Sequence, residues 1–251
     1  MSVVEVQDVS KHFRIPHERR ATILDHLSAA IGLLGGKGFN YEEFWALRDI
    51  TFSLERGDTL GIIGPNGSGK STLLKVMARV MKPNSGSVRI NGSTAAILEL
   101  GIGFHGDLTV RENTIIYGII MGLSKAEVSK RYDSIVDFAG LGKFQDTKLK
   151  HLSSGMQVRL AFSIVVQTDA EVFLVDEAIS VGDIEFQEKC LYKFDEFKKA
   201  GKSIVLVTHD LALVNSFCNK ALYLLEGRMK SFGLSKDVTQ CYLEGLHQKS
   251  G

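Results

Sequence analysis

Residues 64–71 constrain this chain more than any other segment. They read Gly-Pro-Asn-Gly-Ser-Gly-Lys-Ser and match the phosphate-loop pattern GxxxxGKS. An apolar run at residues 60–63 precedes the pattern and a largely apolar run at residues 72–77 follows it, so the loop stands between a predicted strand and a predicted helix. This context predicts a loop that binds the phosphates of a nucleotide.

The residue types of this loop suit that chemistry. Glycines let backbone N–H groups turn inward around phosphate oxygens, where a Cβ would collide. Lys70 would bring a positive charge to the β- and γ-phosphates, and the Ser71 hydroxyl would be a ligand of Mg²⁺, which prefers oxygen. We therefore expect nucleotide-binding residues at Gly64, Pro65, Asn66, Gly67, Ser68, Gly69, Lys70, Ser71 and Thr72. Phosphate loops serve GTPases, kinases, helicases and transport motors, so this segment predicts the chemistry and not the biological role.

A second segment supplies the acidic groups that nucleotide hydrolysis needs. Residues 172–175 are apolar and lead directly into Asp176 and Glu177. A buried strand that ends in two acids delivers them to the carboxyl edge of a parallel sheet. Asp176 is expected to hold Mg²⁺ through water, and Glu177 to orient or deprotonate the attacking water.

The order of apolar runs and helical patterns predicts an α/β fold. Short apolar runs, typical of strands, recur near residues 3–6, 47–54, 59–63, 87–90, 172–175, 203–207 and 221–225. A helix is expected over residues 71–81, and further helices are expected to begin near Val110, Ser124, Ser153 and Ser235. The helical stretch therefore resembles an insertion into a nucleotide-binding core, with the core at about 1–98 and 169–251 and the helical part at about 99–168. Residues 16–41 fit a surface element facing a partner or a simple loop insertion, and the sequence leaves both open.

Charge and cysteine content limit the partners and the compartment. The 30 Lys and Arg residues against 29 Asp and Glu residues give a formal charge of +1, which would not attract nucleic acid or an anionic membrane. The three cysteines lack the spacing of a zinc site and indicate reduced thiols in a cytosolic protein. The chain start shows no secretion signal, and the apolar stretch at residues 27–36 is about half the roughly 20 residues that a membrane span needs. We expect membrane attachment only through a protein partner.

Three further motifs, in order along the chain, resemble those of ABC ATPases. Residues 152–157, Leu-Ser-Ser-Gly-Met-Gln, resemble the signature sequence usually written LSGGQ. Residues 180–183 stand where the family has its D-loop, and residues 207–210 carry His209 where it has its switch histidine. The signature departs from the common form at Ser154, usually Gly, and at Met156, usually Gln. The resemblance covers nearly the whole chain and identifies it as a member of this family.

The resemblance implies a fold, a substrate and an assembly. The fold would be one ABC nucleotide-binding domain: a P-loop NTPase core with an inserted α-helical subdomain and an antiparallel β-subdomain. ATP with Mg²⁺ would lie between the phosphate loop of one chain and the signature of a second copy, in a head-to-tail homodimer. The family implies that the second copy contacts the nucleotide through Ser153, Ser154, Gly155 and Asp183. His209 would contact the γ-phosphate.

Two family positions are assigned with open alternatives. The aromatic residue that stacks on adenine would be Phe13 or, as the runner-up, Trp45. Glu99 stands where the family usually carries a glutamine that contacts Mg²⁺, so it is a candidate metal ligand.

Several sequence segments resemble those of the ATPase subunits of bacterial polysaccharide exporters. They lie at residues 43–50, 96–105, 178–183 and 186–190, whereas Gly106-Asp107 replaces a Pro-Glu often seen in these relatives. Such subunits drive lipid-linked O-antigen, capsule or teichoic-acid chains across the cytoplasmic membrane together with two permease subunits. We therefore expect a peripheral protein on the cytoplasmic face of the inner membrane. Because the sequence stops at Gly251, no C-terminal carbohydrate-binding domain is expected.

Three other classes of protein share some of these features. An ABC ATPase for another transport substrate keeps the same site residues. Non-transport relatives on ribosomes or DNA carry two cassettes, long coiled coils or a basic stripe, and this sequence shows none of them. A regulatory module that binds nucleotide without hydrolysis would not need Glu177 and His209.

Overall fold

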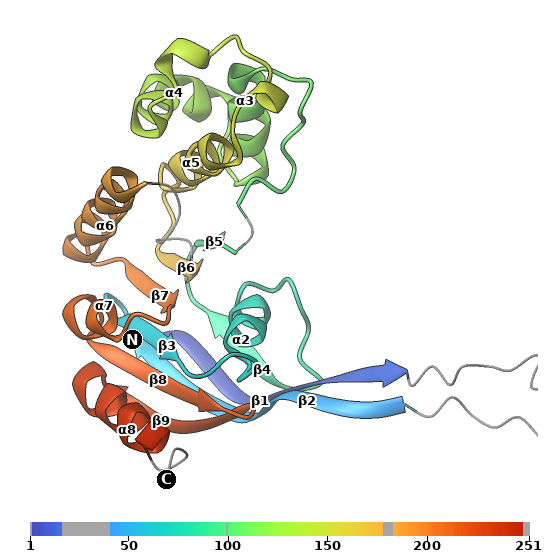
Figure 1. The fold of residues 1–251 in the computed structure, drawn as a ribbon, viewed down its shortest axis with the longest axis vertical. Coiled ribbons are helices and arrows are strands. Elements are labelled where there is room, and N and C mark those ends of the chain that lie inside the picture. The colour runs from blue at the N-terminus through green and yellow to red at the C-terminus, as the bar shows by residue number, and fades with distance from the viewer. Residues whose placement is uncertain (1, 17–40, 99, 178–182, 248–251) are drawn as a thin grey trace, which may run out of the picture.

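The computed structural model describes residues 2–16, 41–98, 100–177 and 183–247 (Figure 1). Two β-sheets stack at one end of the molecule and a group of helices forms a lobe at the other end. Glu99, residues 17–40 and residues 178–182 lie outside the described part.

A six-stranded sheet is the centre of the fold. Its strands, in spatial order, are β5 (Thr94–Ile97), β6 (Val172–Asp176), β7 (Ser203–Val207), β3 (Thr59–Ile63), β8 (Lys220–Leu225) and β9 (Arg228–Leu234). All neighbouring strands are parallel except the β8–β9 pair. Every residue of β3 and β7 is buried, as expected for strands covered on both faces.

This strand order brings the motifs together. Strand β7 lies between β6 and β3, and the three strands are parallel. Their carboxyl ends therefore meet at one edge of the sheet. The phosphate loop follows β3, Asp176 ends β6 and Glu177 follows it, and His209 follows β7 by two residues.

A three-stranded antiparallel sheet covers one side of this core. It consists of β2 (Tyr41–Glu55), β1 (Ser2–Pro16) and β4 (Ser85–Ile90), with β1 in the middle. The far halves of β1 and β2 leave the sheet as a two-stranded arm (Figure 1). We call residues 11–16 and 41–47 the β-arm. Apolar residues of both sheets pack with helix α2 (Lys70–Met77) in a shared core that includes Leu47, Ile50, Leu60, Leu73 and Leu74.

Three helices build the lobe. They are α3 (Val110–Ile120), α4 (Lys125–Ala139) and α5 (Ser154–Val165), with short 3-10 turns at Gly142–Phe144 and Leu149–His151. Helices α3 and α4 begin with reciprocal capping boxes, Thr109 with Glu112 and Ser124 with Glu127. Helices α6 (Ile184–Lys199), α7 (Leu211–Phe217) and α8 (Ser235–His247) pack beside the six-stranded sheet (Figure 1).

Aromatic packing joins the lobe to the sheet. The ring of Phe162 on α5 meets that of Phe186 on α6 edge to face, with the centroids 5.7 Å apart. Phe194 on α6 continues the contact to Phe173 on β6. Such pairs contribute about 0.5–1.5 kcal/mol each beyond their buried area, so α5 is held to the strand that carries the acids.

Most predicted elements are confirmed, with differences in one helix and four strands. Helix α2 ends at Met77 rather than at residue 81, because Arg79 adopts a left-handed backbone with φ of 59° and the chain turns there. Strands β1 and β2 are much longer than predicted, and β5 and β9 were not predicted. Within the described residues, no helix combines the length and the apolar character needed to cross a membrane.

Candidate nucleotide-binding site

A cavity of about 240 Å³ lies at the edge of the sheet where the motifs meet. Residues from the β-arm, the phosphate loop, β6 and the segment after β7 line it. They are Phe13, Phe44, Ala46, Asn66, Gly67, Gly69, Lys70, Ser71, Thr72, Glu177 and His209. The structure thus brings together residues that are far apart in the sequence.

The backbones of two strands lie directly against two glycines of the phosphate loop. A Cβ on Gly64 would lie 2.1 Å from the carbonyl oxygen of Leu224, and one on Gly69 would lie 2.3 Å from that of Ala46. Both glycines have positive φ, 149° and 104°, which side chains rarely tolerate. Strands β8 and β2 therefore fix the loop in the shape that the motif predicts.

Lys70 is held at this loop. Its side chain is buried, and its Nζ donates hydrogen bonds to the carbonyl oxygens of Gly64 (2.8 Å) and Pro65 (3.0 Å). Burial lowers the pKa of Lys70, while the nearby carboxylates of Glu177 and Asp176 act against that shift. An ammonium group has three protons, so one remains for a phosphate oxygen.

Ser71, in the first turn of α2, and Asp176, at the end of β6, offer oxygen atoms next to each other. Burial raises the pKa of Asp176, and a hydrogen bond from the Ser71 side chain acts in the opposite direction. A hard divalent cation such as Mg²⁺ suits this pair of oxygen ligands. Among the described residues no group of three or more His, Cys, Asp or Glu side chains could hold a metal ion. The third candidate ligand, Glu99, lies outside the described residues.

Glu177 and His209 form a close pair. Glu177 Oε1 lies 2.7 Å from His209 Nε2, and each side chain is about half exposed. The backbone of Glu177 has φ of 52°, a left-handed conformation that costs a non-glycine residue about 1–3 kcal/mol. Its N–H donates to the carbonyl oxygen of Val207, 3.0 Å away, and this bond to β7 helps hold the strained residue beside the histidine.

The signature residues surround a different cavity, of about 400 Å³. Ser153 caps helix α5, and its Oγ accepts a hydrogen bond from the Met156 N–H at 3.2 Å. Asp183 caps α6 and also pairs with Arg159, at 3.2 Å between Oδ2 and the guanidinium nitrogen. The lining residues of this cavity are Ser153, Gly155, Met156, Arg159 and Asp183, and none of them lines the cavity at the phosphate loop. Ser154, the first residue of α5, is exposed beside them.

The two candidates for the residue that stacks on adenine, Phe13 and Trp45, lie on opposite faces of the β-arm. Side chains alternate along a strand, so neighbouring residues face opposite sides. Phe13 and Phe44 face the cavity, whereas Trp45 packs its ring against His12 with the centroids 4.9 Å apart. Phe13 therefore lies where an adenine ring could contact it, and Trp45 does not. Sequence reasoning missed Phe44, although a hairpin register would have placed it opposite Phe13.

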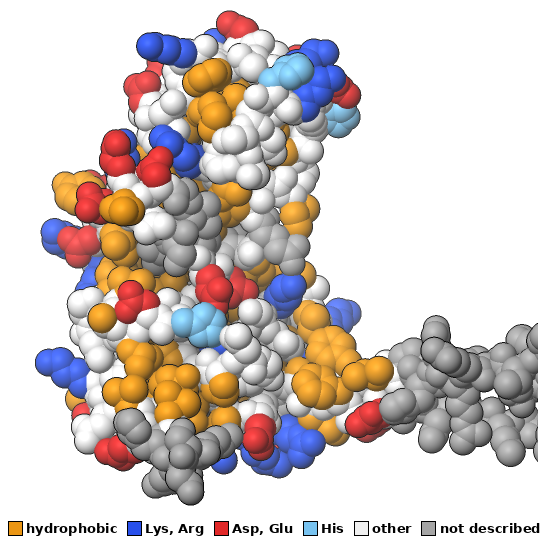
Figure 2. Space-filling model, viewed as in Figure 1, with side chains coloured by type: hydrophobic (Ala, Val, Ile, Leu, Met, Phe, Trp, Pro, Cys, Tyr) orange, Lys and Arg blue, Asp and Glu red, His pale blue; other side chains and the backbone are white. Residues whose placement is uncertain are grey.

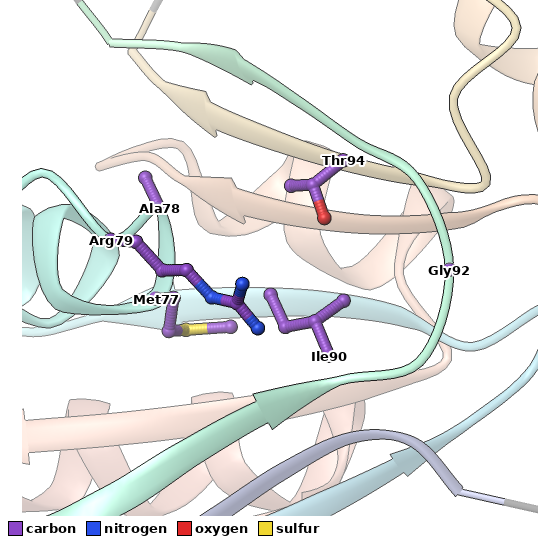
Figure 3. A pocket seen from close by; sticks show the side chains of 6 residues that line it. All are labelled: Met77, Ala78, Arg79, Ile90, Gly92 and Thr94. Atoms are coloured by element: carbon purple, nitrogen blue, oxygen red, sulfur yellow. The ribbon is translucent and has the colours of Figure 1, made fainter.

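A further cavity, of about 250 Å³, lies at the other end of α2 (Figure 3). Its walls are the end of α2 and strand β4, with the Arg79 side chain directed between them. It contains none of the predicted site residues.

Comparisons with known proteins extend this picture. The sequence profile of the family described as ABC transporter matches residues 47–180. The chain belongs to the ABC transporter family. Two solved ABC structures share its fold: an ATP-binding subunit of an ABC transporter, at a TM-score of 0.75 and 24% identity with 98% of each chain covered, and MJ0796. MJ0796 is a dimeric cassette in a post-hydrolysis state with ADP and Pi, matched at a TM-score of 0.71 and 23% identity over 92% of this chain and 98% of that one. The predicted P-loop ABC fold is confirmed.

Curated relatives have a higher sequence identity to the chain than these two structures have. The chain is 41% identical over 248 residues to an O-antigen export system ATP-binding protein of Myxococcus xanthus, covering 98% of this chain and 56% of the relative. It is 41% identical to a teichoic acids export ATP-binding protein of Listeria innocua, covering 85% and 63%. It is 36% identical to an O-antigen export system ATP-binding protein of Klebsiella pneumoniae, covering 97% and 98%. The chain thus spans about half to two thirds of the length of the first two relatives.

Proposed function

We propose that this chain is the ATP-binding subunit of an ABC exporter, which hydrolyses ATP to move a lipid-linked polysaccharide across the cytoplasmic membrane. One observation carries the catalytic part: Lys70, Glu177 and His209 line one cavity at the carboxyl edge of a parallel sheet. The exporter part is supported by the resemblance to O-antigen and teichoic-acid export ATP-binding proteins. The glycan would be of the O-antigen, capsule or teichoic-acid type.

The site residues suit hydrolysis of a terminal phosphate. The phosphate loop and Lys70 would bind the β- and γ-phosphates, and the Glu177 carboxylate would orient the attacking water and accept its proton. The water oxygen would form a bond to the γ-phosphorus while the bond from the γ-phosphorus to the bridging oxygen breaks. ADP would leave with the electron pair of that bond, and inorganic phosphate would be the second product. Bound Mg²⁺, held through Ser71 and Asp176, would supply positive charge for the phosphate oxygens. His209 would contact the γ-phosphate from the position where it now meets Glu177.

A second copy of the chain would complete the site. The N-terminus of α5, with Ser153, lines a cavity separate from the phosphate-loop cavity. A helix N-terminus offers backbone N–H groups and a positive dipole end to an anion. In a head-to-tail dimer the α5 N-terminus of each chain would cover the γ-phosphate bound by the other.

Mixing two inactive variants tests this shared site. We expect Ser153→Asp to abolish ATPase activity, because aspartate caps a helix as well as serine does but would repel the γ-phosphate by about 4 kcal/mol at about 4 Å near a protein surface. Lys70→Ala should also be inactive. A mixed dimer keeps one intact site, with the loop of the Ser153→Asp chain and the signature of the Lys70→Ala chain. An equal mixture should therefore regain up to about a quarter of the wild-type phosphate-release rate.

Ser124→Asp is the matched control, because Ser124 caps α4 in the same way and lines neither cavity. That variant should keep wild-type activity. A mixture no more active than its two components would contradict the shared site.

An apolar groove offers a place for the permease. A cavity of about 440 Å³ runs between the sheet core and the helical lobe. Three of its apolar side chains are largely exposed: Val80 (68%), Ile102 (63%) and Ile120 (56%). Because the groove is lined by both parts of the chain, a permease helix in it would respond when the lobe moves against the core. Attachment to the cytoplasmic face of the membrane would follow from this contact.

Ile120→Glu tests the groove. The variant should keep the ATPase activity of the isolated chain, since Ile120 lines the groove and does not line the phosphate-loop cavity. A buried carboxylate is unfavourable, so the amount of chain that co-purifies with the co-expressed permease should fall at least about tenfold, and surface glycan should fall with it. Leu234→Glu, at a side chain 66% exposed on β9, is the control and should change neither. Normal permease binding by Ile120→Glu would exclude the groove, and loss of permease binding without loss of glycan would indicate another transport substrate.

A further inference from the structure

Two exposed phenylalanines lie side by side on the β-arm. Phe13 and Phe44 are cross-strand partners, and their side chains are 36% and 49% exposed. Directly opposite residues of an antiparallel pair have Cβ atoms about 4.5–5.5 Å apart, so the two rings are neighbours on one face. Figure 2 shows apolar side chains gathered on this arm. Exposed rings of this kind indicate a ligand or a partner.

The surroundings of the pair favour a nucleotide as the occupant. Both rings line the cavity that also contains Lys70, Ser71 and Thr72, so a molecule that contacts the rings also reaches the phosphate loop. The permease groove contains neither phenylalanine. A ligand with a flat apolar part and an anionic part fits both ends of the cavity.

Phe13 is already supported on one face. The Lys11 ammonium lies over its ring, 5.5 Å from the centroid, and donates to the carbonyl oxygen of Lys82 at 2.9 Å. Lys11 is two residues before Phe13 and therefore on the same face of the strand. Lys11 thus covers one face of the Phe13 ring. The Phe44 ring, on the other strand of the β-arm, enlarges the aromatic surface that faces the cavity.

We propose that Phe44 is a second base-binding residue, which together with Phe13 makes the site selective for purine nucleotides. The inference rests on the proposed function, because it assigns the base end of the same ATP site. A purine has two fused rings and overlaps more of a two-ring surface than a pyrimidine does. Stacking energy increases with this overlap, so Phe44 raises the affinity for ATP more than the affinity for CTP.

Equilibrium titration of the purified full chain with ATP, CTP and inorganic tripolyphosphate tests this assignment. For Phe44→Ala we expect the Kd for ATP to rise about 5- to 30-fold, equivalent to about 1–2 kcal/mol. The Kd for CTP should rise less, and that for tripolyphosphate, which has no base, should stay within about twofold. Phe44→Tyr keeps the ring and should restore the preference for ATP.

Trp45→Ala is the matched control, because Trp45 is the next residue on the strand and faces the other side. It should leave all three affinities unchanged. Unchanged affinity for ATP in Phe44→Ala, or an equal loss for ATP and CTP, would overturn the role of Phe44. Failure of the wild-type chain to bind either ATP or tripolyphosphate would instead contradict the proposed function.

Discussion

Glu177→Gln should bind MgATP with nearly wild-type affinity and hydrolyse it about 10²–10⁴-fold more slowly, the usual contribution of a general base. Glutamine has the same shape and keeps an oxygen for the His209 side chain, which lies 2.7 Å from Glu177 Oε1. It cannot accept the proton of the attacking water. Single-turnover phosphate release gives the rate, and equilibrium titration gives the affinity.

The same variant should also accumulate as a nucleotide-bound dimer. Closure is driven by the difference in ATP affinity between open and closed states, and without hydrolysis that difference persists. Size-exclusion chromatography with MgATP should therefore show a dimer for Glu177→Gln and a monomer once nucleotide is removed. If the variant stayed monomeric with saturating MgATP, the shared site would be disproved.

Glu171→Gln is the control for this experiment. Glu171 precedes strand β6 at its other end and forms an ion pair of the same length, 2.7 Å, with Arg56. The substitution removes the same charge from a pair far from the cavity. Wild-type turnover in Glu171→Gln together with wild-type turnover in Glu177→Gln would refute the assignment of Glu177.

The sequence predicted the parts of the site that depend on local pattern. The phosphate loop, the two acids after β6 and His209 after β7 each follow a short apolar strand, and parallel strands present their carboxyl ends at one edge. The spatial order β6-β7-β3, which places these ends next to each other, comes from long-range packing that no local pattern encodes.

The base end of the site was harder to predict because it depends on strand register. Phe44 and Trp45 are adjacent in sequence, and only the pairing of Phe44 with Phe13 decides which ring faces the cavity. A shift of one residue would exchange them. The pairing of Asp183, the cap of α6, with Arg159, in the middle of α5, likewise joins two residues that are 24 positions apart.

Lys70→Met should weaken ATP binding at least about 30-fold, equivalent to about 2 kcal/mol, the lower end of the cost of removing one partner of a buried charge pair. Methionine keeps an apolar side chain of similar length in this buried position, so the loss reports the charge and its hydrogen bonds. Lys70→Ala should bind as weakly and unfold at a lower temperature than Lys70→Met. Both variants remove the donor for the carbonyl oxygens of Gly64 and Pro65, but alanine also leaves a cavity in this buried position. Lys202→Ala is the control, since burial lowers the pKa of that lysine too but it lies outside the cavity. Undiminished ATP affinity in a correctly folded Lys70→Met chain would show that the phosphates bind elsewhere.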